Sequence, residues 1–166
     1  MKLQKLIMVS FKPRASGFSA SVPIGEFMLA RGSPAVRLAR AVRVYEQSLR
    51  ALSSFAASII ALRSRREVTP ARMVWRFGDG VFRLVSKLAE AGVEIDGLYD
   101  HLVRDVGLKR KWLEKAVILR RYVPNEAMIP ASLNWGRCEK GTRRVAEGIA
   151  RRKFTAGIAN DDRGKR

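Results

Sequence analysis

Six cationic side chains lie close together in the segment 108–124, and their chemistry is that of polyanion binding. This segment carries one acid, Glu114, whereas the preceding segment 69–107 has five cations and six acids. A chain that was merely basic throughout would not show this step, so the charge is placed on one element. Ammonium and guanidinium groups concentrated in this way attract phosphates and form charge-assisted hydrogen bonds with them. The six cations are Lys109, Arg110, Lys111, Lys115, Arg120 and Arg121.

Other cations occur in short clusters along a chain that is strongly basic overall. The sequence has 33 Lys and Arg against 15 Asp and Glu, a formal net charge of +18. Nucleic acid, an anionic membrane surface or an acidic protein are the partners for which such a charge is useful. We expect two pairs to contact phosphates beside the main segment, with a solvated surface as the alternative for each. These residues are Arg143, Arg144, Arg151 and Arg152.

Residues that could carry catalysis or hold a metal are few. The single cysteine, Cys138, excludes a disulfide framework, and with the single histidine, His101, it provides no ligand set at zinc spacing. The carboxylates Asp96, Asp100 and Asp105 are separated by four and five residues, which scatters them around a helix. We therefore expect no enzyme activity, no cofactor and no metal.

The sequence also favours a cytoplasmic, nucleoid-associated protein. A lone cysteine is typical of a reducing compartment. The longest nearly apolar stretch, 51–62, has only twelve residues, which is too short to cross a bilayer. The apolar run in residues 1–10 is too brief for a signal peptide. We expect no membrane partner.

Helix start and stop signals predict a long helical hairpin over residues 33–92. Ser33 and Pro34 form a good helix start, no glycine or proline follows until Pro70, and Thr69 with Pro70 opens a second helix that ends at Gly92. Its apolar stripe is expected at Val74, Phe77, Val81, Val85 and Leu88. Two glycines inside this helix, Gly78 and Gly80, predict a close helix contact or a kink.

The first long helix carries an apolar seam in alternating steps of three and four residues. An amphipathic helix packed within its own chain has this pattern, and so does a helical dimer interface. Both interpretations stay open, and a homodimer would use Leu38, Val42, Tyr45, Leu49, Leu52 and Ile59.

The rest of the chain completes an all-α fold with a short extended N-terminal arm. Residues 1–32 are expected to be an arm or linker, within which 2–11 could form a short strand. The region 93–153 is expected to hold a helix over 97–106 capped by Asp96, a turn at Gly107, a helix over about 109–122 that stops before Pro124, and a last helix between Leu133 and Arg152. Residues 154–166 are expected to be a flexible basic tail.

Part of this region, Tyr99 to Ile118, resembles the twenty-residue helix-turn-helix unit of bacterial and archaeal DNA-binding regulators. Gly107 is ninth in the unit, where the turn needs a left-handed backbone. Val103 stands where the family mostly has alanine or glycine, which predicts a wider angle between the two helices. The packing positions are filled by Leu102, Val106, Leu108, Leu113 and Ala116, and the solvent-facing ones by Lys109, Arg110, Lys111, Glu114 and Lys115.

The resemblance implies that the second helix of the unit enters the major groove of DNA. Lys109, Arg110 and Lys111 would then reach base edges or nearby phosphates, while Lys115, Arg120 and Arg121 would follow the phosphate backbone. Glu114 would accept from cytosine, orient an arginine or pair within its own helix.

The function expected is non-enzymatic binding of double-stranded DNA, as in a transcription regulator or a replicon-maintenance factor of the plasmid-partition type. The alternative is an RNA-binding or ribonucleoprotein-associated protein, in which the same cations bind A-form RNA, whose deep major groove does not admit a helix. A scaffold whose long hairpin binds partner helices is the third possibility.

Overall fold

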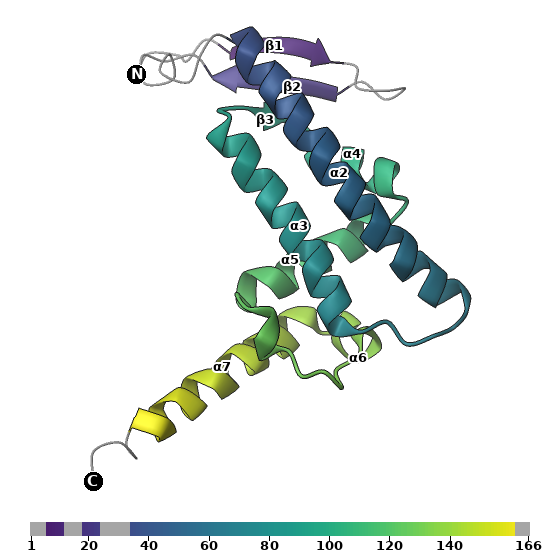
Figure 1. Ribbon diagram of the computed structural model, residues 1–166, viewed down its shortest axis with the longest axis vertical. Coiled ribbons are helices and arrows are strands. Elements are labelled where there is room, and N and C mark those ends of the chain that lie inside the picture. The colour runs from purple at the N-terminus through teal and green to yellow at the C-terminus, as the bar shows by residue number, and fades with distance from the viewer. Residues whose placement is uncertain (1–5, 12–17, 24–33, 162–166) are drawn as a thin grey trace. The chain divides into compact units, whose positions relative to one another are not determined.

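The computed structural model describes the backbone of residues 6–11, 18–23 and 34–161 and the side chains of 35–151. Figure 1 shows its elements in chain order. Over these residues the chain is mostly helical, as the expected all-α class requires. The chain divides into two compact units. The first unit comprises residues 1–54 and 80–110, and the second comprises 55–79 and 111–166.

The two long helices begin and end where the sequence signals predict. Helix α2, Pro34–Ser64, starts at its proline, and helix α3, Ala71–Glu90, follows Pro70 directly. After each helix one residue has a left-handed backbone, Arg66 with φ 58° and Gly92 with φ 67°. The amide of the following residue then donates to a carbonyl in the last turn of the helix, at 2.8 Å after α2 and 3.1 Å after α3. This arrangement satisfies carbonyls that a helix end would otherwise expose.

The first unit contains a three-stranded antiparallel sheet. Strand β1, Leu6–Phe11, pairs with β2, Phe18–Pro23, and β2 also pairs with the short β3, Glu94–Ile95. The strand expected within 2–11 is found as β1. Strand β2 was not predicted, because the glycine, serine and proline content of residues 12–32 is typical of a linker. Residues 1–5, 12–17 and 24–32 of the expected arm lie outside the described residues.

Helix α4, Leu98–Val106, belongs to the first unit and is tied to α2 by one hydrogen bond. The hydroxyl of Tyr45 donates to Oδ2 of Asp105 at 2.6 Å. Burial, and then this carboxylate, raise the pKa of the Tyr45 hydroxyl, which therefore stays protonated and keeps donating. The expected cap at Asp96 is wrong: the N-cap is Gly97, in a left-handed conformation with φ 64° and without a side-chain cap.

Most of the predicted seam on α2 is buried within the chain itself. This agrees with the interpretation in which the helix packs in its own chain, and the homodimer interface stays a prediction. The buried residues are Leu38, Tyr45, Leu52, Ala56 and Ile59, and the half-buried ones are Val42 and Leu49.

The second unit, which resumes at Lys111, holds the C-terminal helices apart from the first residue of α5. These are α5, Arg110–Tyr122, the short η1, Glu126–Met128, α6, Trp135–Glu139, and α7, Thr142–Asp161. The expected end of α5 before Pro124 is confirmed. The prediction of a single last helix between Leu133 and Arg152 is wrong, because the helix is interrupted between α6 and α7. Helix α7 also continues to Asp161, into the part expected to be a flexible tail.

Two backbones of the second unit meet at Gly78 on α3. A Cβ atom placed on Gly78 would lie 2.2 Å from the carbonyl oxygen of Ala116 on α5 and 2.7 Å from its carbonyl carbon. Backbone atoms cannot move aside as a flexible side chain can, so only glycine fits. The close helix contact predicted from the glycines is confirmed at this position.

We expect Gly78→Ala to lower the free energy of unfolding by about 1 to 3 kcal/mol, the usual cost of overpacking, although alanine is the better helix former. Urea denaturation followed by circular dichroism measures this change. Gly148→Ala is the matched control, because Gly148 lies in α7 with no atom within 4 Å of an added Cβ. It should be neutral or stabilising by up to about 1 kcal/mol. Equal effects of the two substitutions would contradict the close contact.

Candidate nucleic-acid interface

Helix α5 buries one face and leaves most of its predicted binding residues on the other. Its buried residues are Trp112, Leu113, Ala116, Val117 and Leu119. Of the residues expected to face solvent, Lys109, Arg110 and Lys111 are exposed, while Glu114 and Lys115 are half-buried. The five packing residues expected from the helix-turn-helix pattern are all buried: Leu102, Val106, Leu108, Leu113 and Ala116.

The turn before α5 has the backbone that was predicted for it. Gly107 is left-handed with φ 73°, and its amide donates to the carbonyl of Val103 at 3.0 Å. This is the simple left-handed helix end, which glycine adopts without strain. Val103 itself is half-buried. The packing of α4 and α5 as a helix-turn-helix stays a prediction.

Arg110 forms a surface ion pair. Its Nη1 lies 2.5 Å from Oδ1 of Asp100, and the two side chains are 55% and 62% exposed. Exposed ion pairs of this kind contribute little to stability and are screened by salt. The guanidinium of Arg110 is therefore accessible to a polyanion, which would compete with Asp100 for it.

Arg120 occupies an internal position, in contrast to the phosphate-contacting role expected for it. Its Nε donates to Oδ1 of Asp79 at 2.6 Å, and the side chains of this pair are only 19% and 10% exposed. The guanidinium also lies over the ring of Trp75, 5.2 Å from the ring centroid. We therefore leave Arg120 out of the candidate interface, whereas its neighbour Arg121 is exposed and stays in it.

The three tryptophans are part of the packing rather than of an exposed stacking surface. Trp112 is 3% exposed and meets Phe77 and Trp135 edge to face, with centroid separations of 5.4 and 5.8 Å. Nε1 of Trp75 donates to the carbonyl of Val123 at 2.6 Å, which satisfies a group at the end of α5. Trp112 is thus not placed to lie against a sugar or base.

The first turns of α7 carry a second group of cations. Arg143 and Arg144 are exposed. Nε of Arg143 donates to Oε1 of Glu147 at 3.0 Å, and its guanidinium lies over the ring of Tyr122, 5.5 Å from the centroid. The hydrogen bond to Glu147 raises the pKa of Arg143, so its charge is constant at any physiological pH. Arg151 is exposed, and the side chain of Arg152 lies outside the described residues.

Two residues near this group were missed by sequence reasoning. Lys140 is exposed at the break between α6 and α7, where a continuous helix was expected. Tyr122 was treated only as the last residue of α5, although its ring supports Arg143. Gly141, which follows Lys140, was the available signal, since glycine often marks a helix end.

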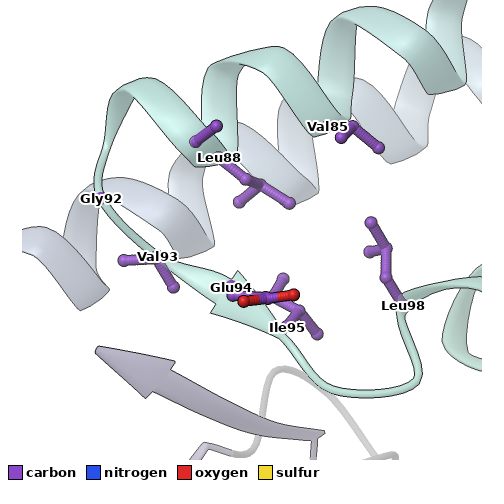
Figure 2. A pocket seen from close by; sticks show the side chains of 8 residues that line it. Val85, Leu88, Gly92, Val93, Glu94, Ile95 and Leu98 are labelled. Carbon is purple, nitrogen blue, oxygen red and sulfur yellow. The ribbon is translucent and has the colours of Figure 1, made fainter. Parts of the chain in front are cut away.

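The first unit has a hollow of about 390 Å³ that is unsuited to a polyanion. Figure 2 shows side chains of α3, β3 and the start of α4 turned toward one another around it, including Val85, Leu88, Ile95 and Leu98. Its charged residue is an acid, Glu94. Val85, expected in the buried stripe of α3, is instead 42% exposed beside this hollow, while Leu84 is buried in its place.

The groups considered for catalysis are held in local contacts. Nδ1 of His101 contacts the guanidinium of Arg104, and burial together with this cation lowers the pKa of the imidazole. Burial raises the pKa of the Cys138 thiol, whose Sγ donates to the carbonyl of Asn134 at 3.4 Å. Among the described residues, no group of three or more His, Cys, Asp or Glu side chains could hold a metal ion. Nor does any helix in this part of the chain have the length and apolar character needed to cross a membrane.

The neighbours Arg120 and Arg121 should have opposite phenotypes. Arg120→Ala should lower the free energy of unfolding by about 3 kcal/mol, because it removes the guanidinium that neutralises the buried carboxylate of Asp79. Arg121→Ala should change it by less than about 0.5 kcal/mol, since Arg121 is exposed. Urea denaturation measures both, and adding Asp79→Asn to Arg120→Ala should recover part of the loss. Equal stability of the two single variants would contradict the internal role of Arg120.

In comparisons with known proteins, no family model, no curated protein and no solved structure matched this chain significantly.

Proposed function

We propose that this protein is a non-enzymatic binder of double-stranded DNA that presents the N-terminal half of α5 to the major groove. The observation that carries the proposal is the orientation of α5. Its apolar side is buried, and Lys111 and Lys115 lie on the side that remains. The exposed Lys109 and Arg110 precede them in the chain. A single α-helix fits the major groove of B-form DNA, and its first residues reach the base edges.

The C-terminal half of the same face of α5 is less accessible. This supports base contacts from the N-terminal half of the helix. Ile118 and Tyr122 are half-buried, and Arg143 lies over the Tyr122 ring. Cations beside this half are suited to phosphates rather than to base edges. In this proposal Arg121, Arg143, Arg144 and Arg151 contact the backbone, with Arg152 as a further candidate from the sequence.

More specifically, the proposal is that the protein acts as a transcription regulator or a replicon-maintenance factor. Both roles need a site that is bound in preference to bulk DNA. Footprinting on genomic DNA of the source organism separates them from an architectural role, because only a sequence-specific protein protects discrete sites.

The decisive variant is Lys111→Ala with Lys115→Ala, measured by fluorescence anisotropy with a labelled 30-base-pair duplex. Wild-type affinity should fall by roughly 10³ or more between 50 and 200 mM salt if six or more phosphates are neutralised. The double variant should bind more weakly at 50 mM. If each lysine neutralises one phosphate, the fall in wild-type affinity over this range should exceed that of the variant by about tenfold.

The charge-matched control is Arg43→Ala with Arg50→Ala, two exposed arginines of α2. It removes the same net charge and should leave the salt dependence nearly unchanged. Equal losses in the two double variants would mean that α5 has no special part in binding. Competition by duplex RNA that exceeds competition by duplex DNA would favour the RNA alternative, and the absence of binding to either would overturn the proposal.

A further inference from the structure

An open pocket of about 400 Å³, most of whose lining residues are charged, lies where the start of α7 meets α5, within the second unit. Four cationic side chains line it: Lys115 from α5, Lys140 from the α6–α7 break, and Arg143 and Arg144 from α7. Lys115 precedes the other three by 25 to 29 positions in the chain. Two acids, Glu139 and Glu147, also line it. The pocket is therefore net positive, in contrast to the apolar hollow of the first unit.

Three of these cations have no acidic partner among the described side chains. Arg143 is paired with Glu147 at 3.0 Å, whereas Lys115, Lys140 and Arg144 form no ion pair within residues 35–151. Like charges gathered around one hollow repel one another, and a bound anion relieves this repulsion. Because these cations line one open hollow, they can contact the same anion together.

Arg143 is oriented before any ligand arrives. Glu147 binds its Nε, and the ring of Tyr122 lies beneath its guanidinium. A guanidinium held in this way loses little conformational entropy when its remaining N–H groups bind an oxyanion. Forked donors of this kind match the oxygens of a phosphate.

We propose that this pocket binds a phosphate group and that, in the protein's proposed function, the group is one backbone phosphate of the bound duplex. The inference rests on that function for the source of the phosphate but not for its chemistry. Since the half-buried Lys115 lies on the same side of α5 as the exposed Lys111, a phosphate held here fixes how α5 is seated along the groove. Contacts of this kind set register without reading sequence.

Gly141 allows the pocket to be blocked without any change in charge. It lines the pocket, and an added Cβ there would meet no atom within 4 Å. Its backbone does not have the positive φ that would exclude a larger residue. Gly141→Leu should therefore fold normally and fill part of the pocket. Gly148→Leu is the matched control, since its Cβ also enters open space but outside the pocket.

Duplex binding at 50 and 200 mM salt tests the pocket through the number of phosphates engaged. Two variants should bind the duplex more weakly than wild type. One is the single variant Gly141→Leu, and the other is the double variant Lys140→Ala with Arg144→Ala. Loss of one phosphate contact lowers the salt slope by about 0.9, so wild-type affinity should fall about threefold more than theirs over this range. Gly148→Leu should behave as wild type. If Gly141→Leu binds the duplex with the same affinity and salt dependence as Gly148→Leu, the inference about the pocket is overturned. The proposed function would still stand.

Titration of ¹⁵N-labelled protein with inorganic phosphate tests the chemistry separately from DNA. Saturable shifts of the Gly141 to Arg144 amides, absent in Gly141→Leu, are expected, with sulfate as a second tetrahedral anion and chloride as the ionic-strength control. If phosphate shifts these amides but no duplex binds, the proposed function fails and the source is a phosphorylated small molecule. If neither phosphate nor duplex shifts them, the pocket is not a phosphate site.

Discussion

The close approach of α3 and α5 at Gly78 is the constraint on which the second unit depends. Because the Gly78 backbone touches the carbonyl group of Ala116, α5 cannot rotate about its own axis without a clash. That fixed rotation buries Leu113 and Ala116 and turns Lys111 and Lys115 outward. The same contact places Asp79, the residue after Gly78, beside Arg120, one helical turn beyond Ala116. A missing side chain on one helix thus determines which cations of another are available to a ligand.

Charge in this protein is divided between cations that are neutralised internally and cations that are not. Arg120 belongs to the first class, since its partner Asp79 is nearly buried and a charge there requires compensation. Lys115, Lys140 and Arg144 belong to the second. Arg143 is intermediate, because Glu147 and Tyr122 hold it in place at the surface without burying it. Net charge alone does not distinguish these cations, whereas the local acids decide which of them could meet a polyanion in the proposed function.

The sequence was sufficient to predict helix boundaries wherever a local signal controls the backbone. Pro34, Pro70, Gly92 and Gly107 mark helix boundaries through their own conformational preferences, and each boundary was predicted. Features that depend on distant residues were not predictable. The partner of Arg120 is 41 residues away, and nothing near Arg120 distinguishes it from the exposed Arg121. Similarly, β2 forms through pairing with β1 and β3 in a stretch whose composition is typical of a linker, and Lys140 becomes part of a pocket only because the last helix breaks beside it.

The tryptophans have a practical consequence that follows from where they lie. Trp75, Trp112 and Trp135 all belong to the second unit, and they are the only three in the sequence. Intrinsic tryptophan fluorescence therefore reports the unfolding of that unit alone, whereas far-ultraviolet circular dichroism reports helices of both units. Coincidence of the two transitions would indicate a single cooperative molecule, and separation would indicate two domains that melt independently.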